Sequence, residues 1–163
     1  MSEMARPFAI ERIGSGATPS MVEATATERT AVAARLRVLD VGALRCDYRL
    51  RRIGLTAIEA AGTLKAVVTE ICVITLDPFS HTVTEAFTVH FVPSGTEDEE
   101  PEPDAIDQIP FDGAAIDLGE AAVEQLALAL DPYPRRPGAS LPDDDALDVP
   151  GPFAALSRLR PKA

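Results

Sequence analysis

The chain contains few aromatic side chains and no tryptophan. Phe, Tyr and Trp make up 5% of its 163 residues, whereas hydrophobic residues as a whole make up 46%. That share is enough for a packed core in a chain whose length corresponds to about one domain, but the core must be mainly aliphatic. The scarcity of rings argues against a small-molecule or lipid binder that encloses its ligand in an apolar cavity.

Cysteine and histidine are equally scarce. Cys46 and Cys72 lie far apart without a C-x-x-C motif, which is typical of small buried thiols in a reducing cytoplasm rather than of a disulfide framework. His81 and His90 are the only histidines, and no G-x-S-x-G, H-E-x-x-H or glycine-rich phosphate loop accompanies them. We therefore expect these histidines to be surface or sheet-packing residues. The missing nucleophile and base argue against a hydrolase, and we expect no catalytic residue and no cofactor.

The sequence also lacks long apolar runs. No run approaches membrane-spanning length, and residues 1–20 contain no continuous apolar segment of the kind found in a secretory signal. We expect a cytoplasmic protein with no membrane partner.

Basic residues are outnumbered by acidic residues, 15 to 26, but the two signs are unevenly distributed. Residues 29–65 carry eight basic and three acidic side chains, whereas residues 97–148 carry sixteen acidic and two basic side chains. A protein with a net charge of -11 is a poor general nucleic-acid binder, yet a local basic face can still contact phosphate. The total charge therefore excludes neither kind of partner.

Two segments have the periodicity of helices. In residues 116–136, Asp117 is placed to cap the first amides and Glu120 has the spacing of a capping box. The apolar positions of this segment share one arc, opposite Glu120, Glu124 and Asp131, and Asp131-Pro132 ends the helix. Capping and solvation explain Asp117, Glu120 and Glu124 without acid-base chemistry, and Gly119 is expected to be a small local cost. A second, short helix is predicted over residues 26–36, with Thr25 and Glu28 as its capping box.

The region between these helices has the alternation of β-strands. From residue 43, Leu44, Cys46, Tyr48 and Leu50 alternate with polar residues, which predicts a half-buried strand. We predict a short strand over residues 55–61, a longer one over 62–75, and another over 82–92 after the Asp77-Pro78 turn. The short turns between them favour an antiparallel arrangement.

The flanking segments are expected to be less regular. Residues 1–20 form an arm that is ordered only by packing, with a loose start. Residues 94–108 combine a charge block with two prolines and predict a mobile acidic loop. Residues 137–163 form a proline-rich tail with a short amphipathic docking segment at 152–159. The predicted fold is a single α+β domain over residues 21–136, with a curled antiparallel sheet of four to five strands flanked by two helices.

Three segments together resemble the YceD family, the large ribosomal RNA subunit accumulation proteins, in the form found in alphaproteobacteria. These segments read TATERTAVAARL, EICVITLDPFSHTVTEAFTVHFVP and IDLGEAAVEQLALALDPYPRRPGA. The segment PFAALSRL is also similar to the family. The resemblance implies a non-enzymatic cytoplasmic role in accumulation of the large-subunit ribosomal RNA and a link to a basic large-subunit ribosomal protein. The residues that carry the resemblance are Cys72, Thr75, Leu76, Pro78, Phe79, Asp117, Leu118, Glu120, Glu124, Gln125, Leu126 and Pro132.

The chain departs from the wider family where many members carry a C-x-x-C motif. Here Cys72 falls on the first cysteine and Thr75 on the second. A metal or redox role of that pair is therefore not carried over, because a lone thiolate without a nearby histidine cannot complete a tetrahedral zinc site. We expect no bound metal.

Two charged groups are candidate contact sites. On the first strand Arg45, Arg49 and Arg51 share one side and Arg52 follows. Alternate residues of a strand project about 7 Å apart, close to the phosphate spacing of a nucleic-acid strand. These arginines contact ribosomal RNA, or they pair with the acidic loop, or they simply solvate an open sheet face. The candidate contacts to a basic ribosomal protein are Glu97, Asp98, Glu99, Glu100 and Glu102, for which the alternative is a solvated linker.

We therefore predict a non-catalytic factor for large ribosomal subunit biogenesis, with ribosomal RNA, a pre-ribosomal large subunit or a basic ribosomal protein as partner. The alternative is a small-molecule or lipid binder that uses the concave sheet. Co-purification with precursor large subunits would support the first function, and a ligand retained through purification would support the second.

Overall fold

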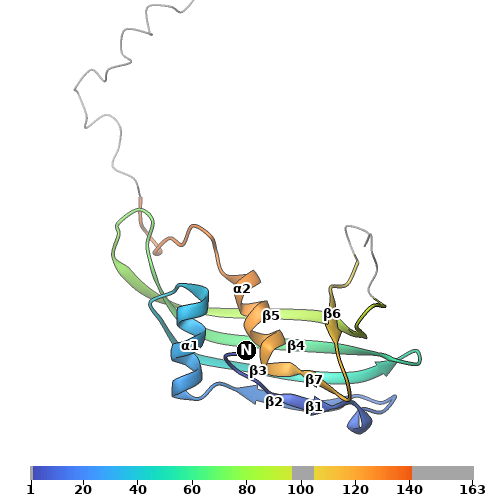
Figure 1. The fold of residues 1–163 in the computed structure, drawn as a ribbon. Coiled ribbons are helices and arrows are strands. Elements are labelled where there is room, and N and C mark those ends of the chain that lie inside the picture. The colour runs from blue at the N-terminus through green and yellow to red at the C-terminus, as the bar shows by residue number, and fades with distance from the viewer. Residues whose placement is uncertain (1, 97–104, 141–163) are drawn as a thin grey trace, which may run out of the picture.

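The fold is built on a five-stranded main sheet with both helices on one face, as a computed structural model of the chain shows (Figure 1). The structure describes residues 2–96 and 105–140. Five strands form the sheet in the order β2-β3-β4-β5-β6. Their bounds are β2 Thr18–Glu23, β3 Asp40–Ile53, β4 Ala57–Ile71, β5 Pro78–Pro93 and β6 Gln108–Phe111. The predicted α+β class with a mostly antiparallel sheet is confirmed.

Neighbouring strands from β2 to β5 are antiparallel, whereas β6 pairs with the end of β5 in parallel, from His90 beside Gln108 to Pro93 beside Phe111. A second, two-stranded sheet joins β1 (Pro7–Ala9) to β7 (Ala115–Asp117). The predicted strands did not include β1, β2, β6 or β7. Residues 94–108 were expected to form one acidic loop, but Ser94 donates its amide to Phe111 and β6 begins at Gln108.

Helix α1 (Ala26–Leu36) has the bounds that the sequence predicts. Thr25 accepts a hydrogen bond from the Glu28 amide, and the Glu28 carboxylate accepts one from the Thr25 amide, so the capping box is complete. The Glu28 carboxylate also receives two hydrogen bonds from Arg6 at 2.6 and 2.8 Å. This guanidinium, followed by the Thr25 amide, lowers the pKa of Glu28 to about 2. The N-terminal arm is thereby attached to the first turn of the helix.

Helix α2 (Leu118–Ala129) is shorter than predicted and differs at its first turn. Asp117 caps it by accepting hydrogen bonds from the Gly119 and Glu120 amides, both at 3.0 Å. The predicted reciprocal contact from Glu120 is wrong, because its carboxylate pairs with Arg35 at 2.6 Å instead. Gly119 is more than a small cost: a Cβ there would lie 1.8 Å from the Met4 carbonyl oxygen. Only glycine allows the arm to pass that close to the helix.

The two strands predicted over residues 55–61 and 62–75 are one strand, β4, which ends at Ile71. Gly62 does not interrupt it, because the Phe87 ring of the neighbouring strand fills the space above its Cα; a Cβ would lie 2.3 Å from the ring. The β-branched residues after Ile71 do not extend the strand. They form the turn into β5, in which Leu76 has a positive φ of 61°.

The N-terminal residues are held by strand pairing as well as by packing. Met4 has no exposed surface, β1 pairs with β7, and β2 lies along β3. Between β1 and β2 runs a short 3-10 helix, η1 (Ile10–Arg12). Residues 1–20 therefore include the start of an edge strand and one side of the core.

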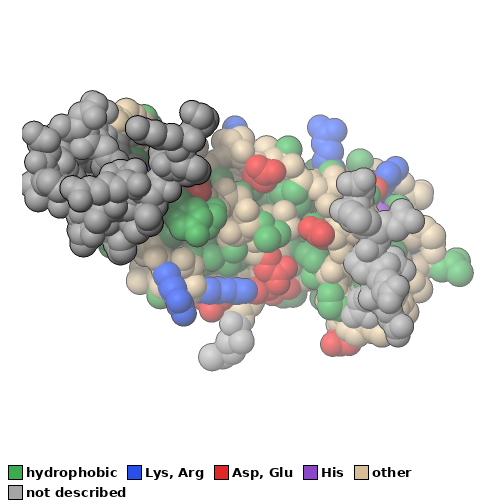
Figure 2. All heavy atoms as spheres, turned by 90° about the horizontal axis from the view of Figure 1, so that it is seen from above, with side chains coloured by type: hydrophobic (Ala, Val, Ile, Leu, Met, Phe, Trp, Pro, Cys, Tyr) green, Lys and Arg blue, Asp and Glu red, His purple; other side chains and the backbone are tan. Residues whose placement is uncertain are grey.

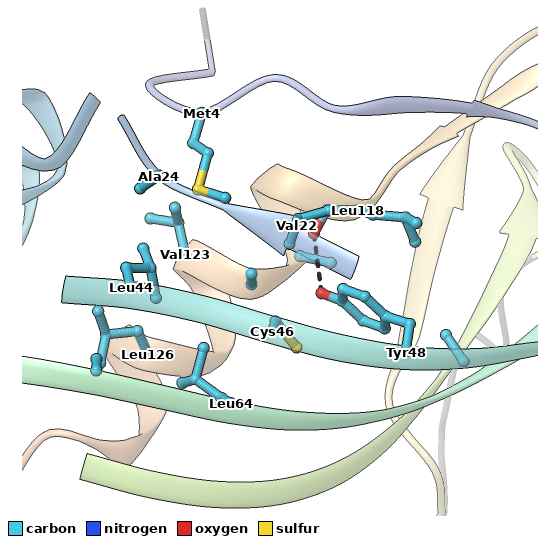
Figure 3. Close-up of a cluster of buried hydrophobic side chains, with 14 of the residues drawn as sticks. Met4, Val22, Ala24, Leu44, Cys46, Tyr48, Leu64, Leu118, Val123 and Leu126 are labelled. Carbon is cyan, nitrogen blue, oxygen red and sulfur yellow. Dashed lines mark hydrogen bonds between the residues drawn. The ribbon is translucent and has the colours of Figure 1, made fainter. Parts of the chain in front are cut away.

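The core lies between the sheet and α2 (Figure 3). Leu44, Leu64, Val123 and Leu126 pack there with 0 to 1% of their surface exposed. Tyr48 contributes both ring and hydroxyl, because its hydroxyl donates a 2.8 Å hydrogen bond to the Leu118 carbonyl oxygen. Burial raises the pKa of this hydroxyl, so it stays protonated as a donor. The core thus fixes where α2 begins on the sheet.

Candidate functional site: the helix-free face of the sheet

The face of the sheet opposite the helices carries the charged side chains that the sequence singles out. We call it the helix-free face. Strand alternation places the odd-numbered residues of β3 and β4 and the even-numbered residues of β5 on it. Leu44, Cys46, Tyr48 and Leu50 point to the other side and are buried. Arg45, Arg49 and Arg51 are therefore brought together on one exposed surface, as predicted.

Two of these arginines are held by neighbouring carboxylates. Arg45 donates two hydrogen bonds to Asp47, at 2.7 and 3.0 Å, and Arg51 donates two to Glu59, at 2.5 and 3.0 Å. Hydrogen bonds from Arg45 and Arg51 lower the pKa of Asp47 and of Glu59, respectively. One alternative from the sequence was that the arginines pair with the acidic loop. Among the described residues, the partners of Arg45 and Arg51 are instead the strand carboxylates Asp47 and Glu59.

The side chain of Arg49 makes no hydrogen bond or ion pair with residues 2–96 or 105–140, and neither does the side chain of Lys65. Both side chains are exposed on the helix-free face. Lys65 sits directly across from Arg45 in the pairing of β3 with β4. Lys65 was not among the candidate residues predicted from the sequence. It stands between the apolar residues Leu64 and Ala66, so the alternation of β4 already indicated that its side chain points to the face opposite theirs.

A shallow hollow of about 850 Å³ lies beside Arg49 in the middle of this face. Its floor consists of small side chains, because β4 and β5 present alanine and threonine there. We call it the central hollow, and it is lined by Pro19, Met21, Asp47, Arg49, Ala61, Thr63, Ala86 and Thr88 with the adjoining backbone. It combines one unpaired guanidinium, one carboxylate and small apolar groups on an open surface.

Arg52 does not belong with the other three arginines. Its guanidinium donates hydrogen bonds to the Ile10 and Ile13 carbonyl oxygens at 2.8 and 3.4 Å, and its amide donates to Gly14. It attaches the segment between β1 and β2 to the end of β3. Glu97, Asp98, Glu99, Glu100 and Glu102, the candidate contacts to a basic protein, lie outside the described residues.

The residues of the resemblance form two groups. Cys72, Thr75, Leu76, Pro78 and Phe79 make the turn from β4 to β5. In α2, Leu118, Gln125 and Leu126 are buried, and Asp117 caps the helix. Glu120 is bound by Arg35, which also reaches Glu3 at 2.7 Å. Burial and the neighbouring Glu120 raise the pKa of Glu124. Pro132 follows the end of the helix. The buried members and the helix cap maintain the fold, whereas Leu76 is 74% exposed in the turn at the end of the sheet.

The two cysteines occupy opposite electrostatic environments, although neither has exposed surface. The Arg136 amide donates to the Cys72 sulfur at 3.4 Å. That amide and the amide of Thr75 lower the pKa of Cys72 to about 6. Burial in the core raises the pKa of Cys46 to about 11. Among the described residues no group of three or more His, Cys, Asp or Glu side chains is placed to hold a metal ion.

The histidines have structural neighbours. His81 Nε2 lies 2.6 Å from a carboxylate oxygen of Glu70, and the His81 ring stacks on Phe79. His90 Nε2 lies 3.6 Å from Glu59. Both pairs sit on neighbouring strands, which fits the expectation of sheet-packing histidines.

The fold and this face define a small α+β protein with a packed helix-covered face and an open, charge-bearing face. The chain belongs to the YceD family: the family model described as "Large ribosomal RNA subunit accumulation protein YceD" matches residues 60–159. This confirms the resemblance: the match includes its β4–β5 and α2 segments, whereas the first segment, residues 25–36, precedes the matched range. No curated protein and no solved structure matches the chain significantly. The family's name implies a role in the accumulation of large-subunit ribosomal RNA. Within residues 2–96 and 105–140, no helix has the length and apolar character to span a membrane.

Proposed function

We propose that this protein is a non-catalytic, cytoplasmic factor that supports large-subunit ribosomal RNA accumulation by contacting that RNA through the helix-free face. The observation that supports the proposal most is the pair of exposed, unpaired cations on this face, Arg49 and Lys65, within a family named for ribosomal RNA accumulation. Phosphate contacts from such cations supply affinity without reading sequence. The open hollow beside Arg49 leaves room for the sugar-phosphate chain.

Electrostatics limits how many of the four candidate arginines take part. Arg45 and Arg51 already neutralise Asp47 and Glu59, so a phosphate must compete with a carboxylate for each of them. Arg52 is bound to backbone carbonyls. Among the described residues Arg49 has no carboxylate partner, and Lys65 makes no ion pair, although its charge helps to lower the pKa of Asp47. These two are therefore the first contacts of the proposal. A net charge of -11 opposes RNA at long range, so the interaction must be local and of modest strength.

The test compares two double variants that remove the same charge. Arg49→Gln with Lys65→Gln removes the proposed contacts, whereas Arg37→Gln with Arg135→Gln removes two exposed cations from other parts of the surface. Binding to large-subunit ribosomal RNA fragments is measured across a salt series. Losing two phosphate contacts should flatten the log-log salt dependence by about 1.5 to 2, and the control should change it far less. Equal slopes for the two variants would overturn the proposal.

The acidic stretch supports a second contact, to a basic large-subunit ribosomal protein. Five acids stand within six residues of the sequence: Glu97, Asp98, Glu99, Glu100 and Glu102. A polyanion attracts a cationic partner at long range, and the attraction weakens as the Debye length shrinks with salt to about 8 Å at physiological ionic strength.

Replacing these five acids with Ser and Gln should reduce capture of the basic protein in pull-down, while the stability of the fold holds or rises slightly. The matched control replaces five other acids, Asp112, Asp143, Asp144, Asp145 and Asp148, so the net charge changes by the same amount. Unaffected capture would identify the stretch as a linker and leave the helix-free face as the main contact surface.

A further inference from the structure

One edge of the main sheet is left unpaired over most of its length. β5 runs from Pro78 to Pro93, but β6 pairs with it only from His90 to Pro93. Over residues 79–88 the side of β5 away from β4 has no strand beside it among the described residues. Ten residues of strand span about 33 Å. This is a long edge for a domain of this size.

The direction of the unpaired backbone groups follows from the pairing. His90 donates its amide to the Asp107 carbonyl oxygen, on the β6 side of the strand. The register of β5 with β4 has no bulge, so every second residue before His90 presents its amide and carbonyl to the same side. Those residues are Ser80, Thr82, Thr84, Ala86 and Thr88, and all are exposed. They form a row of donors and acceptors with no partner in the described part of the chain.

The sequence of this edge has few of the features that prevent strands from associating. Proteins protect such edges with charged side chains, especially lysine, and with proline, bulges or very short strands. Residues 79–88 contain no proline and no lysine, and Glu85 is their one acidic side chain. Three of the residues with outward-facing amides are threonines, which favour strands. The opposite edge strand, β2, has only six residues and includes Pro19 and Glu23. A long edge with so little protection is typical of a strand that is covered by a partner.

The charge near this edge indicates what kind of chain would cover it. The charged or titratable side chains of residues 79–88 are Glu85 and His81. Charges of both signs lie around them: Lys65 is directly across from Thr84 in the pairing of β4 with β5, and Arg135 and Asp131 lie beside Phe79 and His81. Seen from above, acidic and basic side chains are both visible on this side of the molecule (Figure 2). The net charge of -11 disfavours a second copy of this chain. A cationic segment is favoured.

We infer that residues 79–88 of β5 bind an extended, lysine- or arginine-bearing segment of a partner protein by strand addition. Main-chain hydrogen bonds to Thr82, Thr84 and Ala86 supply the affinity, and the net charge of -11 favours a basic chain over an acidic one. The cationic character of the partner rests on the proposed contact with a basic ribosomal protein, whereas the mode of binding rests on the β5 edge alone.

Hydrogen exchange of single amides tests the inference. The probe is a synthetic peptide that alternates lysine with valine, compared with one that alternates glutamate with valine. With the lysine peptide, the amides of Thr82, Thr84 and Ala86 should exchange about tenfold more slowly, because each gains a partner. The amides of Val83 and Glu85 already face β4 and should not change. The glutamate peptide should protect less.

Substitutions at one position separate edge binding from other contacts. Thr84→Pro removes an outward amide and should weaken the lysine peptide by about tenfold. Thr84→Lys keeps the amide but repels the peptide, so it serves if the proline variant does not fold. Thr84→Ala should bind like the original chain.

Three results would overturn the inference. The first is that the lysine peptide protects none of these amides. The second is that the amides of Thr82, Thr84 and Ala86 are already protected without peptide, either by a second copy of the protein or by another part of this chain. Sedimentation distinguishes these two cases, because it measures whether the protein is a dimer or a monomer. The third is that Thr84→Pro and Thr84→Lys both bind the peptide normally. Each result is independent of the RNA salt series, so the RNA contact can fail while strand addition holds, and the reverse.

Discussion

The two faces of the main sheet are built from the same strands but differ in burial and composition. On the helix-covered face, Leu44, Leu50, Leu64 and their neighbours are fully buried and aliphatic. On the helix-free face, arginine, lysine and carboxylate side chains stand among alanines and threonines around an open hollow. Burial stabilises the first face by about 25 cal/mol per Å² of apolar surface, whereas exposed ion pairs contribute at most about 1 kcal/mol each. Stability should therefore depend on one face and binding on the other.

The largest expected effect comes from placing a charge in the core beneath α2. Leu126 has no exposed surface, so Leu126→Asp both removes packing and buries a carboxylate, and we expect a loss of about 5 kcal/mol or complete unfolding. Leu128→Asp on the same helix is the control, because 71% of Leu128 is exposed; it should change stability by less than about 0.5 kcal/mol. Chemical denaturation measures both. Equal midpoints for the two variants would show that the assignment of the buried face of α2 is wrong.

A smaller loss is expected where the N-terminal arm crosses α2. In Gly119→Ala the new methyl group would meet the Met4 carbonyl oxygen, so the backbone of the arm must move, at a cost of about 2 to 3 kcal/mol. Alanine otherwise favours a helix by about 1 kcal/mol, so the sign of the effect is informative. Gly16→Ala, where no atom lies within 4 Å of the added Cβ, should be nearly neutral. A stabilising Gly119→Ala would mean that the arm does not pack on the helix.

The sequence predicts elements that carry their own periodicity and misses those that depend on a distant partner. The boundaries of α1 follow from Thr25 and Glu28, and the buried residues of β3 follow from alternation alone. In contrast, β1, β6 and β7 have three or four residues each. Such short strands exist only because another strand lies beside them, which no local pattern records. Gly62 and Gly119 were misjudged for the same reason, because Phe87 and Met4 are far away in sequence.

The candidate site was predicted in the same partial way. Period-two alternation places Arg45, Arg49 and Arg51 on one face, and the structure shows them there. The partner of Arg51 is Glu59, which faces it only through the register of β3 with β4. Arg52 was grouped with the others by adjacency, although the next residue of a strand points to the opposite face. Alternation therefore identifies a face, and register determines which charges on it are unpaired.

The cap of α2 lies on the helix-covered side of the sheet, yet it is a polar group, so its substitution tests whether hydrogen bonds as well as apolar burial stabilise that side. One oxygen of Asp117 accepts hydrogen bonds from the amides of Arg6, Gly119 and Glu120. Asp117→Ala should cost about 1 to 2 kcal/mol, at the upper end for a helix cap because an arm contact is lost as well. Asp117→Asn keeps an acceptor and should recover about half. If thermal unfolding shows no difference between Asp117→Ala and the original chain, the cap does not hold the arm.

The cysteines provide a comparison that depends on pH. The pKa of Cys72 is lowered to about 6 by backbone amides, and that of Cys46 is raised to about 11 by burial. Ultraviolet thiolate absorbance should show one transition near pH 6, absent in Cys72→Ser and retained in Cys46→Ala. The folded pKa of Cys72 lies below its ordinary value of 9.0. Its stabilising contribution is therefore complete above pH 9 and is lost as the pH falls through about 6. The destabilisation of Cys72→Ser should accordingly be larger at pH 9 than at pH 6, and a constant difference would contradict the lowered pKa.

The smallest expected effect on stability concerns the face proposed to bind. Arg45, Arg49 and Arg51 are exposed, and within the described part of the chain only Arg45 and Arg51 have carboxylate partners. Replacing all three with Gln should lower the free energy of unfolding by no more than about 1 kcal/mol, because exposed ion pairs exchange with water at little cost. The same variant should flatten the salt dependence of binding to large-subunit ribosomal RNA by about 2 to 3 on a log-log plot. Arg49→Gln alone should account for about one unit of that change in slope, because no carboxylate loses its partner. Arg45→Gln and Arg51→Gln each leave an acid without its partner, Asp47 or Glu59, and that acid also repels phosphate. If the triple variant unfolds readily, the helix-free face is part of the stability of the sheet, and if the slope is unchanged, these arginines only solvate it.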